Sequence, residues 1–292
     1  MANSPTLIAN TLAAVRDHSR RYQDFTYVYP VISRRSRGLS IGVNLNPDKL
    51  CNFDCVYCEV DRTIPGKRRD VDLAQVQDEL RWLIQHALSG GLAREPKFSE
   101  APELTRVVRD IAFSGDGEPT MVQNFLECVQ AVVDVKRELG LTDTRIVLIT
   151  DAAGLDKASV KAGLALMDQN QGEIWGKLDA GTETYYRLVN RSPVRFERIL
   201  ANLRDTARVR PIIIQSLFLR THGSPIGTTE LRAYCDRLRD IVAAGGQIQE
   251  VHAYTVARPT PEPWATKLSA AELEAIASTI RETTGLPVSI FD

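Results

Sequence analysis

The sequence alternates short apolar runs with stretches of helical periodicity, and this alternation restricts the fold more than any other feature. The intervals between the apolar runs are far too long for hairpins, so the runs are predicted to pair as parallel strands through right-handed crossovers. The sequence therefore predicts an α/β fold, a partial (β/α)6 barrel of parallel strands. The predicted buried strands are residues 39–45, 107–113, 145–149, 173–178, 211–218 and 248–254.

Helices are predicted from apolar residues that recur on one face. Asp72 with Gln75 resembles a capping box, so the first helix is expected to start near residue 72. Ser269 with Glu272 opens a last helix that is expected to stop near Gly285. Between these two lie helical patterns over residues 121–139, 195–208 and 229–243, whereas the Gly- and Pro-rich stretch 89–104 is predicted as a surface loop.

Chain length and net charge restrict the domain organisation and the kinds of partner that the protein can have. A chain of 292 residues suits one α/β barrel, so residues 1–38 are predicted as an N-terminal extension and residues 39–292 as a single domain. The 36 Lys and Arg residues balance the 37 Asp and Glu residues, so net charge does not indicate a nucleic-acid partner. The sequence shows neither a signal-peptide pattern nor an apolar run of about 18 residues, and it predicts a cytoplasmic protein without a membrane partner.

Three cysteines crowd into the segment KLCNFDCVYCEVD, residues 49–61. A structural zinc site normally takes four protein ligands. The remaining cysteines, Cys128 and Cys235, lie among apolar residues at helical spacing and are predicted to be buried core thiols. A four-iron cluster bound by three thiolates keeps one iron open for a cofactor, which explains a missing fourth ligand. The predicted metal ligands are Cys51, Cys55 and Cys58.

The spacing Cys51-x3-Cys55-x2-Cys58, with Tyr57 before the last cysteine, resembles the cluster motif of radical S-adenosylmethionine (SAM) enzymes. SGDGEPT, which follows the second predicted strand, resembles the segment that receives the SAM amino group in that superfamily. The resemblance implies a radical SAM type of partial barrel, a [4Fe–4S] cluster and SAM as cofactors, and a small reductant protein of the flavodoxin or ferredoxin type. It also implies reductive cleavage of SAM to a 5′-deoxyadenosyl radical that abstracts hydrogen from a substrate.

The resemblance also assigns candidate SAM contacts. Glycine allows the backbone to approach a ligand, and a carboxylate suits an ammonium group, although a tight turn with solvated acids would give the same GDGEP pattern. Other polar residues follow the predicted strands, where ligands bind in parallel α/β folds, and turn, cap or packing roles are the alternatives. The candidates are Tyr57, Ser114, Gly115, Asp116, Gly117, Glu118, Thr150, Asp151, Lys177, Asp179, Gln215 and Tyr254.

Within the superfamily, VNLNPDKLCNFDCVYCEVD, FSGDGEPT and KLDAGTE are most similar to the wyosine (tRNA tricyclic base) synthases and their bacterial relatives. The similarity spans roughly residues 38–260. Wyosine synthases hold a second cluster on additional N-terminal cysteines, whereas no cysteine precedes Cys51 here, so one cluster is expected.

Basic residues flank the cysteine segment and leave RNA as a candidate ligand. They suit phosphate binding, and a solvated surface is the alternative. Two other functions remain open: an activating enzyme that installs a glycyl radical on a protein partner, and a non-catalytic iron–sulfur or zinc-binding module. The two patches are Arg34, Arg35 and Arg37, and Lys67, Arg68 and Arg69.

Overall fold

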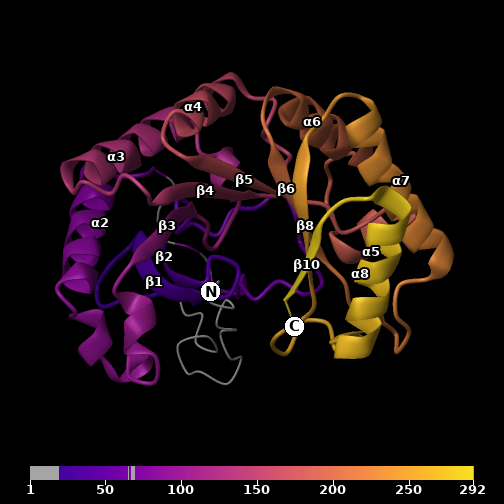
Figure 1. The fold of residues 1–292 in the computed structure, drawn as a ribbon, viewed down its shortest axis with the longest axis horizontal. Helices are drawn as coiled ribbons and strands as arrows, with labels where there is room; N and C mark the ends of the chain where they lie inside the picture. Colours follow the sequence, from indigo (N-terminus) through magenta and orange to yellow (C-terminus); the bar gives the residue numbers. More distant parts are fainter. Residues whose placement is uncertain (1–19, 65, 67–69, 292) are drawn as a thin grey trace, which may run out of the picture. The chain divides into compact units, whose positions relative to one another are not determined.

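A computed structural model describes residues 20–64, 66 and 70–291. Within these residues the main sheet has eight strands in the order β1-β2-β3-β4-β5-β6-β8-β10, which Figure 1 labels. The strands β7 and β9 pair in a separate two-stranded sheet. The strands are β1 (Val28–Ser33), β2 (Gly38–Val43), β3 (Val108–Phe113), β4 (Arg145–Thr150), β5 (Gly172–Lys177), β6 (Ile212–Leu217), β7 (Arg220–Thr221), β8 (Ile248–Tyr254), β9 (Ala265–Thr266) and β10 (Val288–Phe291).

All six predicted strands are present, as β2, β3, β4, β5, β6 and β8. Parallel pairing joins β2 to β3, β5 to β6, β6 to β8 and β8 to β10. The sequence analysis missed β1, which pairs antiparallel with β2 and lies inside the predicted N-terminal extension. Residues 1–19 of that extension lie outside the described residues, and the single-domain organisation stays a prediction.

The predicted helices are confirmed, with ends that differ by a few residues. The Asp72 side chain accepts the N–H of Gln75, and Ser269 and Glu272 form the expected capping box before Gly285 ends the last helix in a left-handed conformation. Two helices, α4 and α5, were not predicted. The helices are α2 (Leu73–Leu88), α3 (Phe125–Glu138), α4 (Ala158–Asp168), α5 (Glu183–Val189), α6 (Phe196–Val209), α7 (Thr228–Ala243) and α8 (Ala270–Thr284), with short 3-10 helices at Leu92–Arg94, Pro96–Phe98, Pro102–Thr105 and Pro119–Met121.

The chain divides into two compact units. Unit 1 takes its described residues from 1–48, 67–147 and 162–172, and unit 2 takes them from 49–66, 148–161 and 173–292. The cysteine segment, residues 51–58, therefore belongs to unit 2. Among the described helices, none combines the length and the apolar character needed to cross a membrane.

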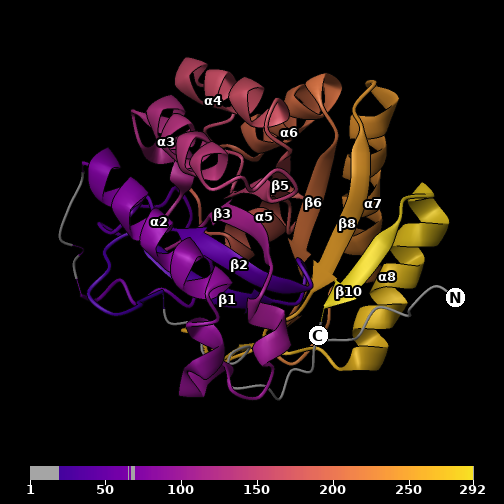
Figure 2. The ribbon, with the colours of Figure 1, turned by 60° about the vertical axis from the view of Figure 1, so that its left-hand side comes forward.

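In unit 1, α2 packs along β1, β2 and α3 (Figure 2). The buried carboxylate of Glu79 on α2 accepts the backbone N–H groups of Thr26, Tyr27 and Val28, at 2.8, 2.8 and 3.0 Å. These bonds satisfy three donors at the start of β1 and fix the edge strand to the helix.

In unit 2, helices cover one face of the strands. On that face, the Ser216 hydroxyl lies 2.6 Å from the Tyr234 hydroxyl of α7, and a Cβ at Gly176 would lie 2.5 Å from the Leu203 side chain of α6. Because neighbouring residues of a strand point to opposite faces, Lys177 and Gln215 lie on the other face.

Candidate cofactor site

The cysteine loop, residues 51–58, is fixed to the C-terminal end of α5 by backbone hydrogen bonds. The N–H of Asp54 donates to the Asn190 carbonyl, and the N–H of Val56 donates to the Val189 carbonyl, each at 3.0 Å. Val56 is buried in an apolar cluster at the carboxyl ends of β6 and β8. The loop is therefore held at the strand ends, where the sequence predicted it. The other members of the cluster are Tyr57, Val189, Leu217, Leu219, Val256 and Ala265.

Each of the three cysteine sulfurs accepts an N–H group. The three cysteines are half-buried. N–H donors directed at sulfur stabilise a thiolate or a metal-bound sulfur, since both carry negative charge. Two of the donors, Arg62 and Asn190, were not identified from the sequence. The contacts are Phe53 N to Cys51 Sγ at 3.4 Å, Asn190 Nδ2 to Cys55 Sγ at 3.5 Å and Arg62 Nη1 to Cys58 Sγ at 3.0 Å.

Three cysteine sulfurs form a donor set that suits an iron–sulfur cluster, which is bound by thiolates. Among the described residues, no three His, Cys, Asp or Glu side chains lie close enough together to bind a single metal ion. A four-iron cluster takes its thiolates on separate irons, so its ligands need not converge on one point. Burial raises the pKa of the Cys55 thiol to about 11, against the lowering effect of Lys177. Without metal this thiol is therefore protonated at neutral pH, and ligation would release its proton.

Asp179 is the centre of a buried hydrogen-bond network beneath the cysteine loop. Its side chain is fully buried and accepts from the Tyr57 hydroxyl, from Asn190 Nδ2 at 2.7 Å and from the Leu217 N–H at 2.9 Å, while Lys177 Nζ lies at 3.4 Å. An ionised carboxylate offers about four acceptor positions. Asp179 is thus engaged within the protein, and it positions Tyr57, which precedes Cys58, and Asn190, which donates to the Cys55 sulfur.

Lys177 is the partly exposed member of this network. Its ammonium lies 4.8 Å from the centre of the Tyr57 ring and its side chain is 18% exposed. Burial lowers the pKa of Lys177, but the charges of Asp179 and Tyr254 raise it. The resulting pKa lies well above the ordinary value of a lysine. The lysine therefore stays charged. Tyr254 is half-buried against the apolar cluster that holds Tyr57.

Thr150 and Asp151 shape the turn after β4. The Thr150 hydroxyl accepts the N–H of Ala152 at 3.1 Å, and the Asp151 carboxylate accepts the N–H of Ala153 at 2.8 Å. Ala152 is buried with a φ of 69°, an unfavourable backbone region for alanine. The turn brings Asp151 Oδ2 to 3.9 Å from Cys51 Sγ, so this predicted residue lies beside the cysteine loop.

The SGDGEP segment belongs to unit 1 and is organised by Asn44, which the sequence analysis did not identify. Asn44 accepts the N–H of Asp116 at 3.1 Å and donates to its carboxylate at 2.9 Å, and Arg20 donates to the same carboxylate at 3.2 Å. A Cβ at Gly115 would lie 2.3 Å from Asn44 Oδ1, so packing requires glycine there. The Ser114 hydroxyl lies 3.1 Å from the Tyr29 hydroxyl.

Glu118 ends this segment as a helix cap. It is 2% exposed, and its Oε1 accepts the N–H and the hydroxyl of Thr120 at 3.0 and 2.6 Å. Gly117 lies between the two acidic residues. The predicted SAM contacts therefore form two groups, residues 114–118 within unit 1 and the remaining candidates within unit 2.

The structure describes only the first of the two predicted basic patches. Arg34, Arg35 and Arg37 lie in the turn between β1 and β2. Lys67, Arg68 and Arg69 lie outside the described residues.

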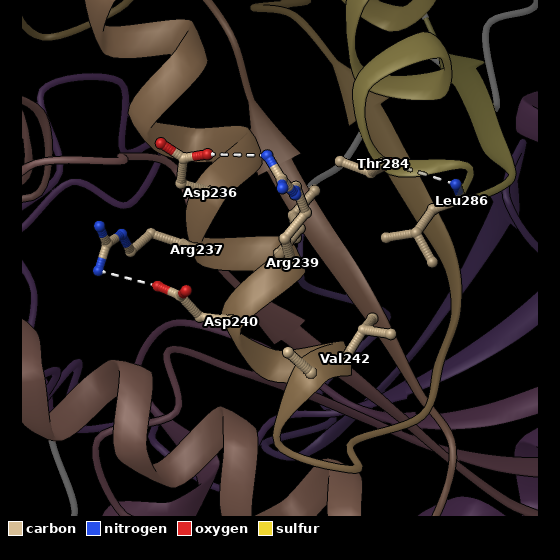
Figure 3. Close-up of a pocket in the computed structure, with 9 residues that line it drawn as sticks. Asp236, Arg237, Arg239, Asp240, Val242, Thr284 and Leu286 are labelled. Atoms are coloured by element: carbon tan, nitrogen blue, oxygen red, sulfur yellow. Dashed lines mark hydrogen bonds and ion pairs between the residues drawn. The ribbon is translucent and has the colours of Figure 1, made fainter.

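A pocket of about 550 Å³ lies elsewhere in unit 2, between the C-terminal half of α7 and the end of α8 (Figure 3). Ion pairs join Asp236 to Arg239 at 3.4 Å and Arg237 to Asp240 at 3.1 Å along its wall. None of the residues predicted as ligands from the sequence lines this pocket.

Solved structures with the same fold are radical SAM enzymes. SuiB of Streptococcus suis, bound to SAM, superposes with a TM-score of 0.58 and 12% identity over 86% of this chain and 50% of SuiB. The wyosine synthase TYW1, with a lysine–pyruvate adduct bound, has a TM-score of 0.54 and 16% identity over 83% of this chain and 73% of TYW1. The fold is the partial (β/α) barrel of radical SAM enzymes, and the resemblance seen in the sequence is confirmed at the level of fold.

Several sequence relatives carry the name UPF0026. A UPF0026 protein of Helicobacter pylori is 33% identical over 104 residues, which are 35% of this chain and 29% of that protein. A UPF0026 protein of Methanocaldococcus jannaschii is 28% identical over 162 residues, 56% of this chain and 43% of that protein. A Brachyspira hyodysenteriae protein named GTPase Obg is 24% identical over 182 residues, 62% of this chain and 23% of that protein. The chain thus spans less than half the length of these relatives, and no family model matches it.

Proposed function

We propose that this protein is a radical SAM enzyme of the oxidoreductase type that binds a [4Fe–4S] cluster through Cys51, Cys55 and Cys58. The observation that carries the proposal is the cysteine loop, in which three half-buried sulfurs each accept an N–H group. The fold supports it, because the solved structures that share this fold are radical SAM enzymes. When bound, the cluster supplies an open iron for SAM and the electron that cleaves it to methionine and a 5′-deoxyadenosyl radical.

The chain's own residues contribute binding, charge and exclusion of water. Arg62 and Lys177 place two positive charges near the thiolates, which offsets the negative charge of a cluster. The apolar cluster that buries Val56 and Tyr57 excludes water from that side of the loop, and exclusion of water protects a reactive radical from side reactions. Residues 114–118 are proposed to receive the SAM amino group through backbone groups and the partly exposed carboxylate of Asp116. An RNA base is the proposed substrate class, and a small protein of the flavodoxin or ferredoxin type is the proposed electron donor.

The test is SAM cleavage by the anaerobic, cluster-loaded protein. With dithionite as reductant, we expect 5′-deoxyadenosine and methionine in equal amounts, measured by liquid chromatography. Omitting the reductant, or replacing the three cluster cysteines by alanine, should abolish both products. Cell RNA added to parallel reactions should accelerate cleavage if it contains the substrate. A protein that carries its cluster and still leaves SAM intact would contradict the proposed function.

The Arg62 contact predicts a shift in the reduction potential of the cluster. Arg62→Met removes a positive charge and a hydrogen bond to the Cys58 sulfur, and both stabilise the more negative reduced state. We therefore expect a lower potential in a redox titration followed by electron paramagnetic resonance. Arg81→Met, on the exposed surface of α2, is the matched control and should leave the potential unchanged. Equal potentials in the wild type and Arg62→Met would show that the contact does not tune the cluster.

A further inference from the structure

Three polar side chains form a row across the face of unit 2 that its helices leave uncovered. Lys177 of β5 is the register partner of Gln215 on β6, and Gln215 is the register partner of His252 on β8. Register partners of parallel strands point to the same face of the sheet. Lys177 also contacts Tyr57, the residue before Cys58, so the row lies next to the cysteine loop.

Gln215 and His252 are buried, and each has a side-chain nitrogen without a hydrogen-bond partner among the described residues. Gln215 is 3% exposed and His252 is 4% exposed. The part of the chain that the structure describes provides no hydrogen-bond partner for Gln215 Nε2 or for His252 Nδ1. An unsatisfied buried polar atom costs stability, so two such atoms on adjacent residues indicate a ligand group that satisfies both.

The surroundings of His252 fix the orientation of its ring and the place of its hydrogen. The His252 ring packs edge to face against two aromatic rings. Its centre lies 5.2 Å from the ring centre of Trp175 and 5.1 Å from that of Phe291. His252 Nε2 lies 3.1 Å from a carboxylate oxygen of Glu250, whose other oxygen accepts from the Ser289 hydroxyl. Because a carboxylate only accepts, Nε2 carries a hydrogen, which leaves Nδ1 of a neutral ring as an acceptor.

We propose that Gln215 and His252 together bind one hydroxyl group of a ligand of this enzyme. The Gln215 amide donates to the hydroxyl oxygen, and His252 Nδ1 accepts the hydroxyl hydrogen. A hydroxyl is both donor and acceptor through one oxygen, whereas carboxylate and phosphate oxygens only accept and an ammonium only donates. The inference deepens the proposed function, on which it rests for its ligand: the hydroxyl belongs either to the SAM ribose or to the substrate.

Calorimetry on the anaerobic, cluster-loaded protein distinguishes these sources. The probes are SAM, the four common ribonucleosides and their 2′,3′-dideoxy counterparts. Gln215→Met removes the donor at similar length, His252→Phe keeps the ring and removes its nitrogens, and Gln249→Met is the control at an exposed position of β8. We expect both site variants, but not the control, to bind one probe about tenfold more weakly than the wild type.

Each outcome has one meaning. A loss confined to SAM assigns the hydroxyl to the cofactor. A loss confined to a ribonucleoside, with its dideoxy counterpart already weak in the wild type, assigns it to the substrate. Unchanged affinity for every probe overturns the proposal. Nitrogen NMR of the His252 ring adds a readout that needs no ligand, because a neutral ring with its hydrogen on Nδ1 would also overturn it. None of these measurements requires SAM cleavage, so failure of the proposed function is detected separately.

Discussion

Replacing Cys51, Cys55 or Cys58 by alanine is expected to remove the iron from the protein. The reconstituted wild type should contain about four irons and four labile sulfides per chain, the content of one [4Fe–4S] cluster. Each thiolate is a proposed ligand, and the N–H donors around the three sulfurs cannot replace it because they do not bind iron. Iron and sulfide assays, together with the visible absorption of the protein, measure the result.

The two remaining cysteines are the matched controls. Cys128 on α3 and Cys235 on α7 are fully buried, as the sequence predicted, and burial raises the pKa of both thiols. Cys128→Ala and Cys235→Ala should therefore keep the full iron content. Two results would contradict the assignment: full iron after substitution of all three loop cysteines, or about eight irons per chain with half of them lost in either control.

The second large effect is expected at Asp179. Asp179→Ala leaves the Lys177 ammonium without its buried partner and the Leu217 N–H without its acceptor. Breaking a buried ion pair from one side costs about 3 to 5 kcal/mol of unfolding free energy. Chemical denaturation of the anaerobic, cluster-loaded protein should show a loss of this size. Because Asp179 also orients Tyr57 and Asn190, the variant should lose its cluster faster during dilution with a chelator.

Two further variants separate the ion pair from the rest of the network. Glu183→Ala breaks an exposed ion pair with Arg187 on α5 and should cost less than about 1 kcal/mol. The double variant Lys177→Met with Asp179→Leu removes both buried charges and should be more stable than Asp179→Ala alone. If Asp179→Ala were as stable as Glu183→Ala, the buried network would not stabilise unit 2.

The strand pattern was predictable because buried parallel strands are continuous apolar runs, and β8 begins and ends where the sequence predicted. The strand β1 was missed because its sequence, VYPVIS, contains Pro30, which is unfavourable inside a sheet and is tolerated here on an edge strand. Helix α5 has only seven residues, too few for a clear helical period.

The candidate site was predictable where its residues are close in sequence. The three cysteines were predicted as ligands from their spacing, together with the SGDGEPT segment. Arg62 and Asn190 were not, since an arginine and an asparagine acquire a role here only through the fold that brings their N–H groups to sulfur. Asn44 was missed for the same reason, because its two bonds to Asp116 span 72 positions.

The long sequence separation of the contacts around the cysteine loop affects the biosynthesis of the protein. Tyr57 and Asp179 are 122 positions apart, and Cys55 and Asn190 are 135 positions apart. At about 5 to 20 residues per second, a ribosome needs roughly 6 to 27 s to make the chain between them. During that interval the three thiols lack the side chains that hold their loop, and exposed cysteines are open to oxidation. Oxygen present during translation should therefore reduce the fraction of chains that can accept a cluster, even when purification is strictly anaerobic.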